Sequence, residues 1–326
     1  MAIKNRPSIL VITPVAHIDG LIDKLSRIGD VIYMPDPTEK EVLKKINEVN
    51  AIFTNPNKSK VYLGHEIIST SKNLKAICTA STGRTHIDLH AAQNFNIAIL
   101  SLTKEYETIR KISSTAELAF TLMMASLRNL PEAIDSVRKG DWDYEKFIGR
   151  QLNQLNVGVI GYGRLGEIFS SYCCNFGAKV TVYDPYKIVK DKNINQINNL
   201  EELTSQSDII SLHVHVTSET QGMFGEELLQ STKKDVTIIN TSRGEIVDEH
   251  AIIDFLKNNK NARYCTDVLS GEITSKSESP VLQYLIEAGG YYQIIATPHI
   301  GGMTKDAQLI AYHRAADMLD AFLGKT

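Results

Sequence analysis

The sequence predicts an α/β protein with two doubly wound domains, each a parallel sheet with helices on both faces. The chain has 326 residues, which is long for one hydrophobic core and suits two. Short β-rich runs alternate with helical patterns over residues 1–100, and a second series of this kind begins at Asn156. Strands that are separated by helices indicate βαβ units, and therefore parallel sheets.

The first series contains five expected strands, over residues 9–13, 30–33, 51–54, 75–79 and 97–100. Between the second and third strands, Thr38 and Glu41 form a capping-box pattern that opens an amphipathic helix to about residue 50. A long helix rich in Ala, Leu and Met is expected over residues 116–128, and Pro131 begins another. We expect Met123 and Met124 to pack in the core.

The second series contains six expected strands, over residues 157–161, 179–183, 208–214, 236–241, 263–269 and 293–297. Six strands in this order match a complete dinucleotide-binding sheet. The segment 190–199 is rich in Asn and Lys and is expected to be an exposed loop. A last helix is expected over residues 305–322.

Composition and charge exclude several classes of protein. The net charge is −3 with mixed signs, which argues against a general affinity for nucleic acid. No run reaches the roughly 18 apolar residues of a membrane span. The apolar run 9–12 is too short for a signal peptide, so we expect the cytoplasm. The four cysteines, Cys78, Cys173, Cys174 and Cys265, lack zinc-ligand spacing. They are expected to be small buried side chains, and no metal site is expected.

A Gly-x-Gly-x-x-Gly pattern follows the first strand of the second series and opens a helix over residues 165–176. Gly161 allows the tight turn, Gly163 lets backbone approach a pyrophosphate, and Gly166 lets the helix pack closely on the strand. The pyrophosphate would lie at the helix N-terminus, where free N–H groups favour anions. The pattern alone is a weak signal, but its place between strand and helix favours a dinucleotide site. The expected cofactor-binding residues of this turn are Gly161, Tyr162, Gly163, Arg164 and Leu165.

Asp184 ends the next strand, 23 residues after Gly161. An acidic residue near this place accepts hydrogen bonds from the adenosine ribose, and it would repel a 2′-phosphate. The alternative is that Asp184 and Pro185 only form a turn. Together with the Gly-rich turn, Asp184 predicts NAD rather than NADP as the cofactor.

Arg243, Glu272 and His299 each follow an expected strand of the second series, at the end of the sheet where ligands bind. Hydride transfer at C2 of a 2-hydroxy acid needs a cation to hold the carboxylate and polarise the C2 oxygen, and arginine suits this. It also needs a general acid/base, such as histidine, and a carboxylate to orient that histidine. Singly, these residues could be a turn cap, an exposed loop carboxylate and a hydrogen-bonded polar residue, but together they favour catalysis.

From about residue 8 to about residue 322, the chain resembles the D-isomer-specific 2-hydroxyacid dehydrogenases, relatives of D-lactate, D-glycerate and D-3-phosphoglycerate dehydrogenases. The resemblance implies that Arg243, Glu272 and His299 are the catalytic residues, with Glu272 orienting His299. It is carried by the Gly-rich turn and by residues 80–83, 114–117, 212–214, 240–244 and 297–302.

The resemblance also implies further site residues and an architecture. Ser81, Thr82 and Gly83 would bind the substrate carboxylate. Residues 1–102 and 300–326 would form a discontinuous, flavodoxin-like substrate domain, with a Rossmann NAD-binding domain over residues 103–299. A homodimer is expected, with the region around 104–145 in its interface. The cofactor cleft would be lined by Thr115 near the nicotinamide and by His213, Thr241 and Asp267.

Some positions depart from the family pattern. His215 stands where the family usually has proline, and residues 274–292 look longer than usual. Residues 53–58 lack the Arg-Ser pair of phosphoglycerate dehydrogenases, which puts 3-phosphoglycerate in doubt. The alternative functions are a non-catalytic NAD-sensing protein like the corepressors that share this fold, and a family member acting on formate or phosphite.

Overall fold

The computed structural model describes residues 6–56, 61–272, 275–287 and 292–325. The chain divides into two compact units, which we call unit 1 (Met1–Ile112 and Met303–Thr326) and unit 2 (Ser113–Gly302). The first passage between the units therefore follows residue 112, later than the expected position near 102. Two contacts explain this: Arg314 Nε donates to Glu105 Oε2 at 2.7 Å, and Ile112 packs against the core of unit 1.

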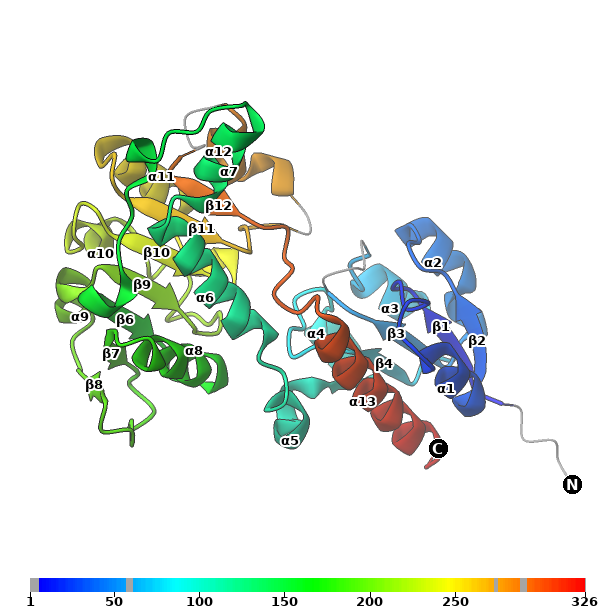
Figure 1. Ribbon diagram of the computed structural model, residues 1–326. Helices are drawn as coiled ribbons and strands as arrows, with labels where there is room; N and C mark the ends of the chain where they lie inside the picture. The colour runs from blue at the N-terminus through cyan, green and yellow to red at the C-terminus, as the bar shows by residue number, and fades with distance from the viewer. Residues whose placement is uncertain (1–5, 57–60, 273–274, 288–291, 326) are drawn as a thin grey trace, which may run out of the picture. The chain divides into compact units, whose positions relative to one another are not determined.

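Unit 1 is a five-stranded parallel sheet in the order β2-β1-β3-β4-β5, which is the flavodoxin-like order (Figure 1). Its α1 and α13 cover one face, while α2, α3 and α4 cover the other. The capping box is present, because Thr38 N–H donates to Glu41 Oε2 and Glu41 N–H to Thr38 Oγ1. The strands are β1 (Ser8–Val11), β2 (Asp30–Tyr33), β3 (Ala51–Thr54), β4 (Ala76–Thr79) and β5 (Ala98–Ser101). The helices are α1 (Leu21–Ile28), α2 (Glu39–Lys45), α3 (His65–Thr70), α4 (Leu89–Asn94), α5 (Tyr106–Ile109) and α13 (Lys305–Leu323), with short 3₁₀ turns at Ile46–Glu48 and Leu102–Lys104.

Unit 2 is a seven-stranded parallel sheet in the order β12-β11-β10-β9-β6-β7-β8. Read from its first strand β6, this is the Rossmann order with one strand added beyond the sixth. Its strands are β6 (Asn156–Ile160), β7 (Lys179–Tyr183), β8 (Ile194–Gln196), β9 (Ile209–Leu212), β10 (Thr237–Asn240), β11 (Arg263–Thr266) and β12 (Ile294–Ala296).

Helices α6 and α8 pack on one face of this sheet, and α9, α10, α11 and α12 pack on the other (Figure 1). The two α/β sheets confirm the predicted fold class. The helices of unit 2 are α6 (Ser114–Leu127), α7 (Leu130–Arg138), α8 (Arg164–Asn175), α9 (Leu200–Gln206), α10 (Glu226–Gln230), α11 (Glu249–Asn258) and α12 (Pro280–Ile286), with 3₁₀ turns at Glu145–Phe147, Leu152–Gln154, Gly244–Ile246 and Lys276–Glu278.

The prediction that residues 190–199 form an exposed loop is wrong in its middle, where β8 lies. This three-residue edge strand pairs with β7, with Val180 opposite Ile194, and the Ile194 side chain is buried. The segment is otherwise polar, and a strand of this length gives almost no alternating pattern. The sheet therefore has seven strands rather than the expected six.

Four of the expected strands of unit 2, β9 to β12, are shorter in the structure. β9, β10 and β11 end at Leu212, Asn240 and Thr266, and the residues after them form loops. At the end of β11, Thr266 Oγ1 donates to Val268 O and accepts from Val268 N–H, which turns the chain out of the sheet. These loops carry the polar residues singled out in the sequence. Among the described residues, no helix has the length and apolar character needed to cross a membrane.

Candidate active site

The Gly-rich turn joins β6 to α8 and is shaped by three glycines. Gly161 has φ +92°, and a Cβ there would lie 2.7 Å from the carbonyl oxygen of His213. A Cβ on Gly166 would lie 2.0 Å from the carbonyl oxygen of Gly161. A Cβ on Gly163 would have no protein atom within 4 Å. The helix N-terminus beyond Gly163 has no side-chain cap, so its N–H groups suit the pyrophosphate of a dinucleotide.

Asp184, at the end of β7, binds this turn directly. Its carboxylate accepts N–H bonds from Tyr162 (2.8 Å), Tyr186 (2.9 Å) and Lys187 (3.0 Å). Two carboxylate oxygens offer about four acceptor positions, so one remains for a ribose hydroxyl. The structure thus brings Asp184 and the Gly-rich turn together, as a site for the adenosine half of a dinucleotide requires.

The other residues of the turn are partly covered. Tyr162 is buried, with Lys187 Nζ 4.9 Å from the centre of its ring. Arg164 and Leu165, in the first turn of α8, are half-buried, and burial lowers the pKa of the Arg164 guanidinium. Leu165 packs against the hydrophobic core on the face of the sheet that α6 and α8 cover.

His213 and Thr241 follow β9 and β10. His213 Nε2 lies 2.8 Å from Ser211 Oγ, and its ring centre is 5.1 Å from that of Phe169. Burial lowers the pKa of His213 to about 3, so the imidazole is neutral at pH 7. Thr241 Oγ1 is buried, and among the described residues it has no hydrogen-bond partner. Such a hydroxyl at the carboxyl edge of the sheet suits a bound ligand. His215, two residues after His213, is exposed.

Arg243 lies in a turn that Asn240 organises. The Asn240 side chain donates to Arg243 O at 2.8 Å and accepts from Ser242 N–H at 3.1 Å. Ser242 Oγ donates to Leu212 O, which ties this turn to β9. Arg243 Nη1 donates to Ser242 O, and no carboxylate among the described residues pairs with the guanidinium. A half-buried arginine held in this way suits binding of a carboxylate from a ligand.

His299 and Glu272 contact each other, on loops that follow β12 and β11. His299 Nδ1 lies 2.5 Å from Glu272 Oε1, and both side chains are largely buried. Because Nδ1 faces the carboxylate, Nε2 is the ring atom left to exchange a proton with a substrate. The structure therefore pairs an acid/base with an orienting carboxylate, in the same unit as Arg243.

Asp267 fixes the backbone around His299. His299 has φ +55°, a left-handed conformation that costs free energy outside glycine. The Asp267 carboxylate accepts from Thr297 Oγ1 (2.6 Å), Ile300 N–H (2.8 Å) and Gly301 N–H (2.7 Å). Burial raises the pKa of Asp267, although these hydrogen bonds and the charge of His299 oppose the shift.

Thr115, in the first turn of α6, lies beside this loop. A Cβ on Gly301 would be 3.0 Å from Asp267 Oδ2 and 3.2 Å from Thr115 Oγ1. Thr115 and Asp267 therefore lie close together beside Gly301. Their roles toward a cofactor remain predictions.

The residues that are expected to bind the substrate carboxylate, Ser81, Thr82 and Gly83, lie in unit 1 after β4. Ser81 Oγ accepts from Gly83 N–H at 2.9 Å, and Thr82 O accepts from Thr103 Oγ1 at 3.1 Å. Their role toward a substrate remains a prediction. Among residues 6–56, 61–272, 275–287 and 292–325, no group of three or more His, Cys, Asp or Glu side chains is placed to hold a metal.

Two acidic residues for which the sequence predicts no role in the site bind the loop that carries Glu272. Glu249 Oε1 accepts from Ser270 N–H at 2.7 Å, and Glu245 Oε1 accepts from Gly271 N–H at 3.3 Å. The sequence signal for Glu249 is weak, since an acidic residue in the first turn of a helix needs no other explanation. Residues 273–274 and 288–291 of the segment expected to be long lie outside the described residues, and α12 occupies part of the rest.

Residues 120–301 match the family model of the D-isomer specific 2-hydroxyacid dehydrogenase NAD binding domain. The chain is 30% identical over 317 residues to the D-3-phosphoglycerate dehydrogenase of Methanocaldococcus jannaschii, covering 96% of this chain and 57% of that protein. It is 31% identical over 268 residues to the hydroxypyruvate reductase of Thermotoga maritima, covering 82% of this chain and 83% of that protein.

The structure is similar to that of the D-lactate dehydrogenase from Aquifex aeolicus complexed with NAD and lactic acid. The TM-score is 0.82 at 27% identity, and the match covers 98% of this chain and 96% of that chain. By contrast, this chain spans about half the length of the D-3-phosphoglycerate dehydrogenases it matches, for example 54% of the one from Archaeoglobus fulgidus.

Proposed function

This chain belongs to the D-isomer-specific 2-hydroxyacid dehydrogenase family, and we propose that it transfers a hydride between NAD(H) and C2 of a small D-2-hydroxy acid or 2-keto acid. The observation that carries the proposal is the contact between His299 and Glu272. It lies in the unit that also holds Arg243 and the Gly-rich turn. An imidazole oriented in this way has the chemistry of a general acid/base.

In the proposed mechanism, the bound NADH supplies the hydride that reaches C2 of the keto acid. The Arg243 guanidinium binds the substrate carboxylate and polarises the C2 carbonyl, since it has no carboxylate partner among the described residues. His299 donates a proton from Nε2 to the C2 oxygen, and in the oxidative direction it removes that proton. Glu272 orients the ring through its contact with Nδ1.

The proposed cofactor residues divide between the two halves of the dinucleotide. Residues 161–165 and Asp184 would bind the pyrophosphate and the adenosine ribose, while Thr115 and Asp267 would lie at the nicotinamide end. His213 and Thr241 would line the space between these ends, His213 as a neutral ring. In unit 1, Ser81, Thr82 and Gly83 would bind the substrate carboxylate. The preference for NAD rests on Asp184, which would repel a 2′-phosphate.

A screen of NADH oxidation tests this function. The purified chain is assayed with glyoxylate, hydroxypyruvate, pyruvate, 2-ketobutyrate and 3-phosphohydroxypyruvate, and the reverse reaction is assayed with formate and phosphite. We expect turnover with at least one 2-keto acid. NADH binding without turnover of any of these compounds would favour a non-catalytic NAD-sensing protein, and reduction of NAD⁺ by formate or phosphite alone would replace the proposed substrate class.

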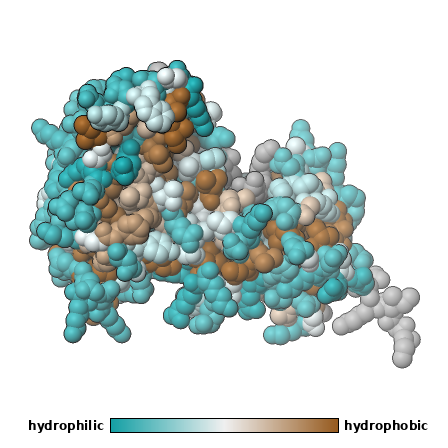
Figure 2. Space-filling model, in the orientation of Figure 1, coloured by the Kyte–Doolittle hydropathy of each residue, from teal (hydrophilic) through white to brown (hydrophobic). Residues whose placement is uncertain are grey.

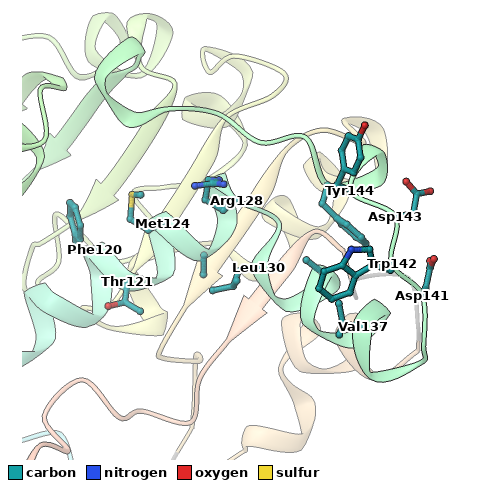
Figure 3. Close-up of a pocket in the computed structure, with 13 residues that line it drawn as sticks. Phe120, Thr121, Met124, Arg128, Leu130, Val137, Asp141, Trp142, Asp143 and Tyr144 are labelled. Carbon is teal, nitrogen blue, oxygen red and sulfur yellow. The ribbon is translucent and has the colours of Figure 1, made fainter.

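We also propose a homodimer, formed through an apolar groove of unit 2. The groove has a volume of about 750 Å³ and lies between α6, α7 and the segment after α7. Figure 3 shows Phe120 and Met124 along α6 and Arg128 directly after it, with Trp142 beside Val137. Trp142 is 87% exposed and Tyr144 is 81% exposed. Figure 2 shows apolar side chains among polar ones on the face that carries α6 and α7. Exposed apolar patches of this kind mark interaction sites.

A second copy of the chain is the proposed occupant. The exposed segment with Trp142 and the groove along α6 belong to the same surface, so two copies related by a two-fold axis can exchange them. The region also coincides with the interface that the family resemblance implies. Trp142 is the one tryptophan of the sequence, so its fluorescence reports directly on this surface.

Sedimentation and fluorescence test the dimer. We expect a dimer whose Trp142 emission shifts to longer wavelength on dilution, and we expect Met124→Glu to give monomers. Ile188→Glu is the matched control, since Ile188 is 81% exposed and does not line the groove. A Trp142 that remains open to acrylamide quenching at every concentration would contradict the proposal.

The cytoplasmic location also remains a proposal, which cell fractionation would test.

A further inference from the structure

Glu249 is a buried carboxylate of unit 2 that lies outside the proposed catalytic set. It is the first residue of α11, and only 5% of its surface is exposed. Burying a carboxylate is costly unless its oxygens accept hydrogen bonds. Both oxygens of Glu249 accept one, and the two donors lie on either side of Glu272 in the sequence.

The first donor is the backbone of the loop that follows β11. Ser270 N–H donates to Glu249 Oε1 at 2.7 Å, two residues before Glu272. Glu272 in turn contacts His299 Nδ1. The hydrogen bond to Glu249 therefore fixes the backbone just before the carboxylate that orients the proposed acid/base.

The second donor is the hydroxyl of Ser279, which lies 2.6 Å from Glu249 Oε2. Ser279 is buried and caps α12, because its Oγ accepts from Leu282 N–H at 3.3 Å. One carboxylate thus joins the start of α11, the loop with Glu272 and the start of α12.

The loop has little room to adopt another path. A Cβ on Gly244 would lie 2.0 Å from the carbonyl carbon of Leu269 and 2.1 Å from Ser270 N, so this peptide lies directly on the turn of Arg243. Gly271 has φ +63°, and Leu269 N–H donates to Glu272 Oε2 at 3.4 Å. The placement of Glu272 depends on this backbone, and Glu249 is the buried group that holds it.

Glu245 offers a comparison on the same loop. It accepts from Gly271 N–H at 3.3 Å and is half-buried. A long hydrogen bond to a group that water can reach contributes less than a short buried one. Glu245 is therefore a matched control for Glu249.

We propose that Glu249 is a positioning residue for the proposed reaction, which acts by holding the Ser270–Glu272 backbone so that Glu272 stays in contact with His299. The inference rests on the proposed function. Glu249 touches neither substrate nor cofactor in this role. Its effect on turnover passes through Glu272.

A double-mutant cycle tests the proposal, with kcat for keto-acid reduction and KM for NADH measured in each variant. Glu249→Ala should lower kcat by about tenfold, because a small displacement of catalytic groups slows turnover. The KM for NADH should stay within about twofold, since the cofactor residues are elsewhere. In a Glu272→Gln background, Glu249→Ala should have almost no further effect on kcat, because both changes act on one pathway.

A readout without turnover completes the test. Hydrogen exchange of the backbone amides in residues 263–272 should be faster in Glu249→Ala than in Glu245→Ala. Glu249→Gln should keep most of the wild-type kcat, because its side-chain carbonyl can still accept from Ser270 N–H. Glu249→Asp should lose kcat, because the shorter side chain cannot reach that N–H group. This pair of variants keeps the test informative if Glu249→Ala does not fold.

Several results would overturn the inference. A wild-type kcat in Glu249→Ala, equal kcat values in the Gln and Asp variants, or independent and multiplying effects of the Glu249 and Glu272 changes would each do so. A wild-type chain that reduces no 2-keto acid would instead contradict the proposed function. Asp208→Asn, a change to a largely buried carboxylate at the opposite edge of the sheet, should leave kcat unchanged and so controls for a general loss of stability.

Discussion

At the amino edge of the sheet in unit 2, Asp208 pairs with cations. Its Oδ1 lies 2.9 Å from Lys233 Nζ and 3.6 Å from Arg150 Nη1. At the carboxyl edge, Asp184 and Asp267 accept from backbone N–H groups and one threonine hydroxyl. Asp208 thus neutralises cations and also accepts from Asn156 N–H at 2.8 Å, whereas Asp184 and Asp267 hold loops in place through neutral donors alone.

This difference bears on where a ligand can bind. Asp184 and Asp267 accept hydrogen bonds from neutral donors and form no ion pair with Arg243. The Arg243 guanidinium therefore stays available for a substrate carboxylate. At the amino edge, Lys233 and Arg150 are paired with Asp208, so we expect this cluster to affect stability rather than turnover. If the comparison is right, changes at the carboxyl edge affect kinetics and changes at the amino edge affect unfolding.

The largest effect is expected from Arg243→Ala, which removes the cation of the carboxyl edge. We expect kcat/KM for the keto acid to fall by about a thousandfold, through both KM and kcat, because binding and polarisation are lost together. Arg243→Lys should recover only part, since an ammonium cannot make the two-pronged contact. Steady-state kinetics measure this, and a KM effect with an unchanged kcat would limit Arg243 to binding.

His299→Ala should lower kcat by at least about a hundredfold, the usual contribution of a general acid. The dissociation constant of NADH, measured by its fluorescence, should hardly change. His215→Ala is the control, because its imidazole is exposed and should alter kcat by less than about twofold. A large effect of His215 together with a small effect of His299 would reassign the acid/base.

Much of this carboxyl edge could be predicted from the sequence. Arg243, Glu272 and His299 each follow a strand, and parallel strands bring their carboxyl ends to one edge, so the pattern alone places them together. The structure adds that Glu272 and His299 are in contact. The roles of Glu245 and Glu249 could not be predicted, since they depend on which loop folds back over α11.

Other differences have equally local causes. β8 could not be predicted from the sequence, because a three-residue edge strand buries too few side chains to show an alternating pattern. Met123 is buried as expected, and Met124 packs against the same core but is only half-buried and also lines the groove of unit 2, because consecutive residues on a helix point in different directions. Cys78, Cys173 and Cys265 are buried thiols as expected, and Cys174, next to Cys173, is only half-buried.

Asp184→Ala should narrow the preference for NADH over NADPH by about tenfold, because repulsion of the 2′-phosphate and a ribose hydrogen bond disappear. Some loss with both cofactors is also expected, since Asp184 binds the backbone of the Gly-rich turn. The ratio of the two kcat/KM values measures the preference. Asp191→Ala, an exposed carboxylate seven residues later, should leave the ratio unchanged. Equal use of both cofactors by the wild-type protein would contradict the assignment.

The smallest kinetic effect is expected from Asp208→Asn, which should leave kcat unchanged and lower Tm by a few degrees at pH 7. Burial alone would raise the pKa of Asp208, but the hydrogen bond from Asn156 N–H and the charges of Lys233 and Arg150 together lower it. A lowered pKa in the folded state stabilises the protein above the unfolded value of about 3.9, and this stabilisation is lost as pH falls through the folded value.

Thermal unfolding across pH checks this sign. The difference in Tm between wild type and Asp208→Asn should be largest near neutral pH and should decrease as the pH falls through the lowered folded-state pKa of Asp208. Asp235→Asn is the control, because Asp235 is more exposed and its carboxylate lies 3.9 Å from Arg150. A difference that persists unchanged in acid would mean that packing, and not charge, accounts for the contribution of Asp208.

The close approach of Gly244 to the Leu269–Ser270 peptide has a consequence for how this protein can be altered by evolution or by design. The distance leaves no space for any side chain larger than hydrogen at position 244. A graft of another turn at this place will therefore clash unless it keeps glycine at position 244 or exchanges the loop with Glu272 as well. These two segments, about 25 residues apart in the sequence, can be redesigned independently only as long as position 244 stays glycine.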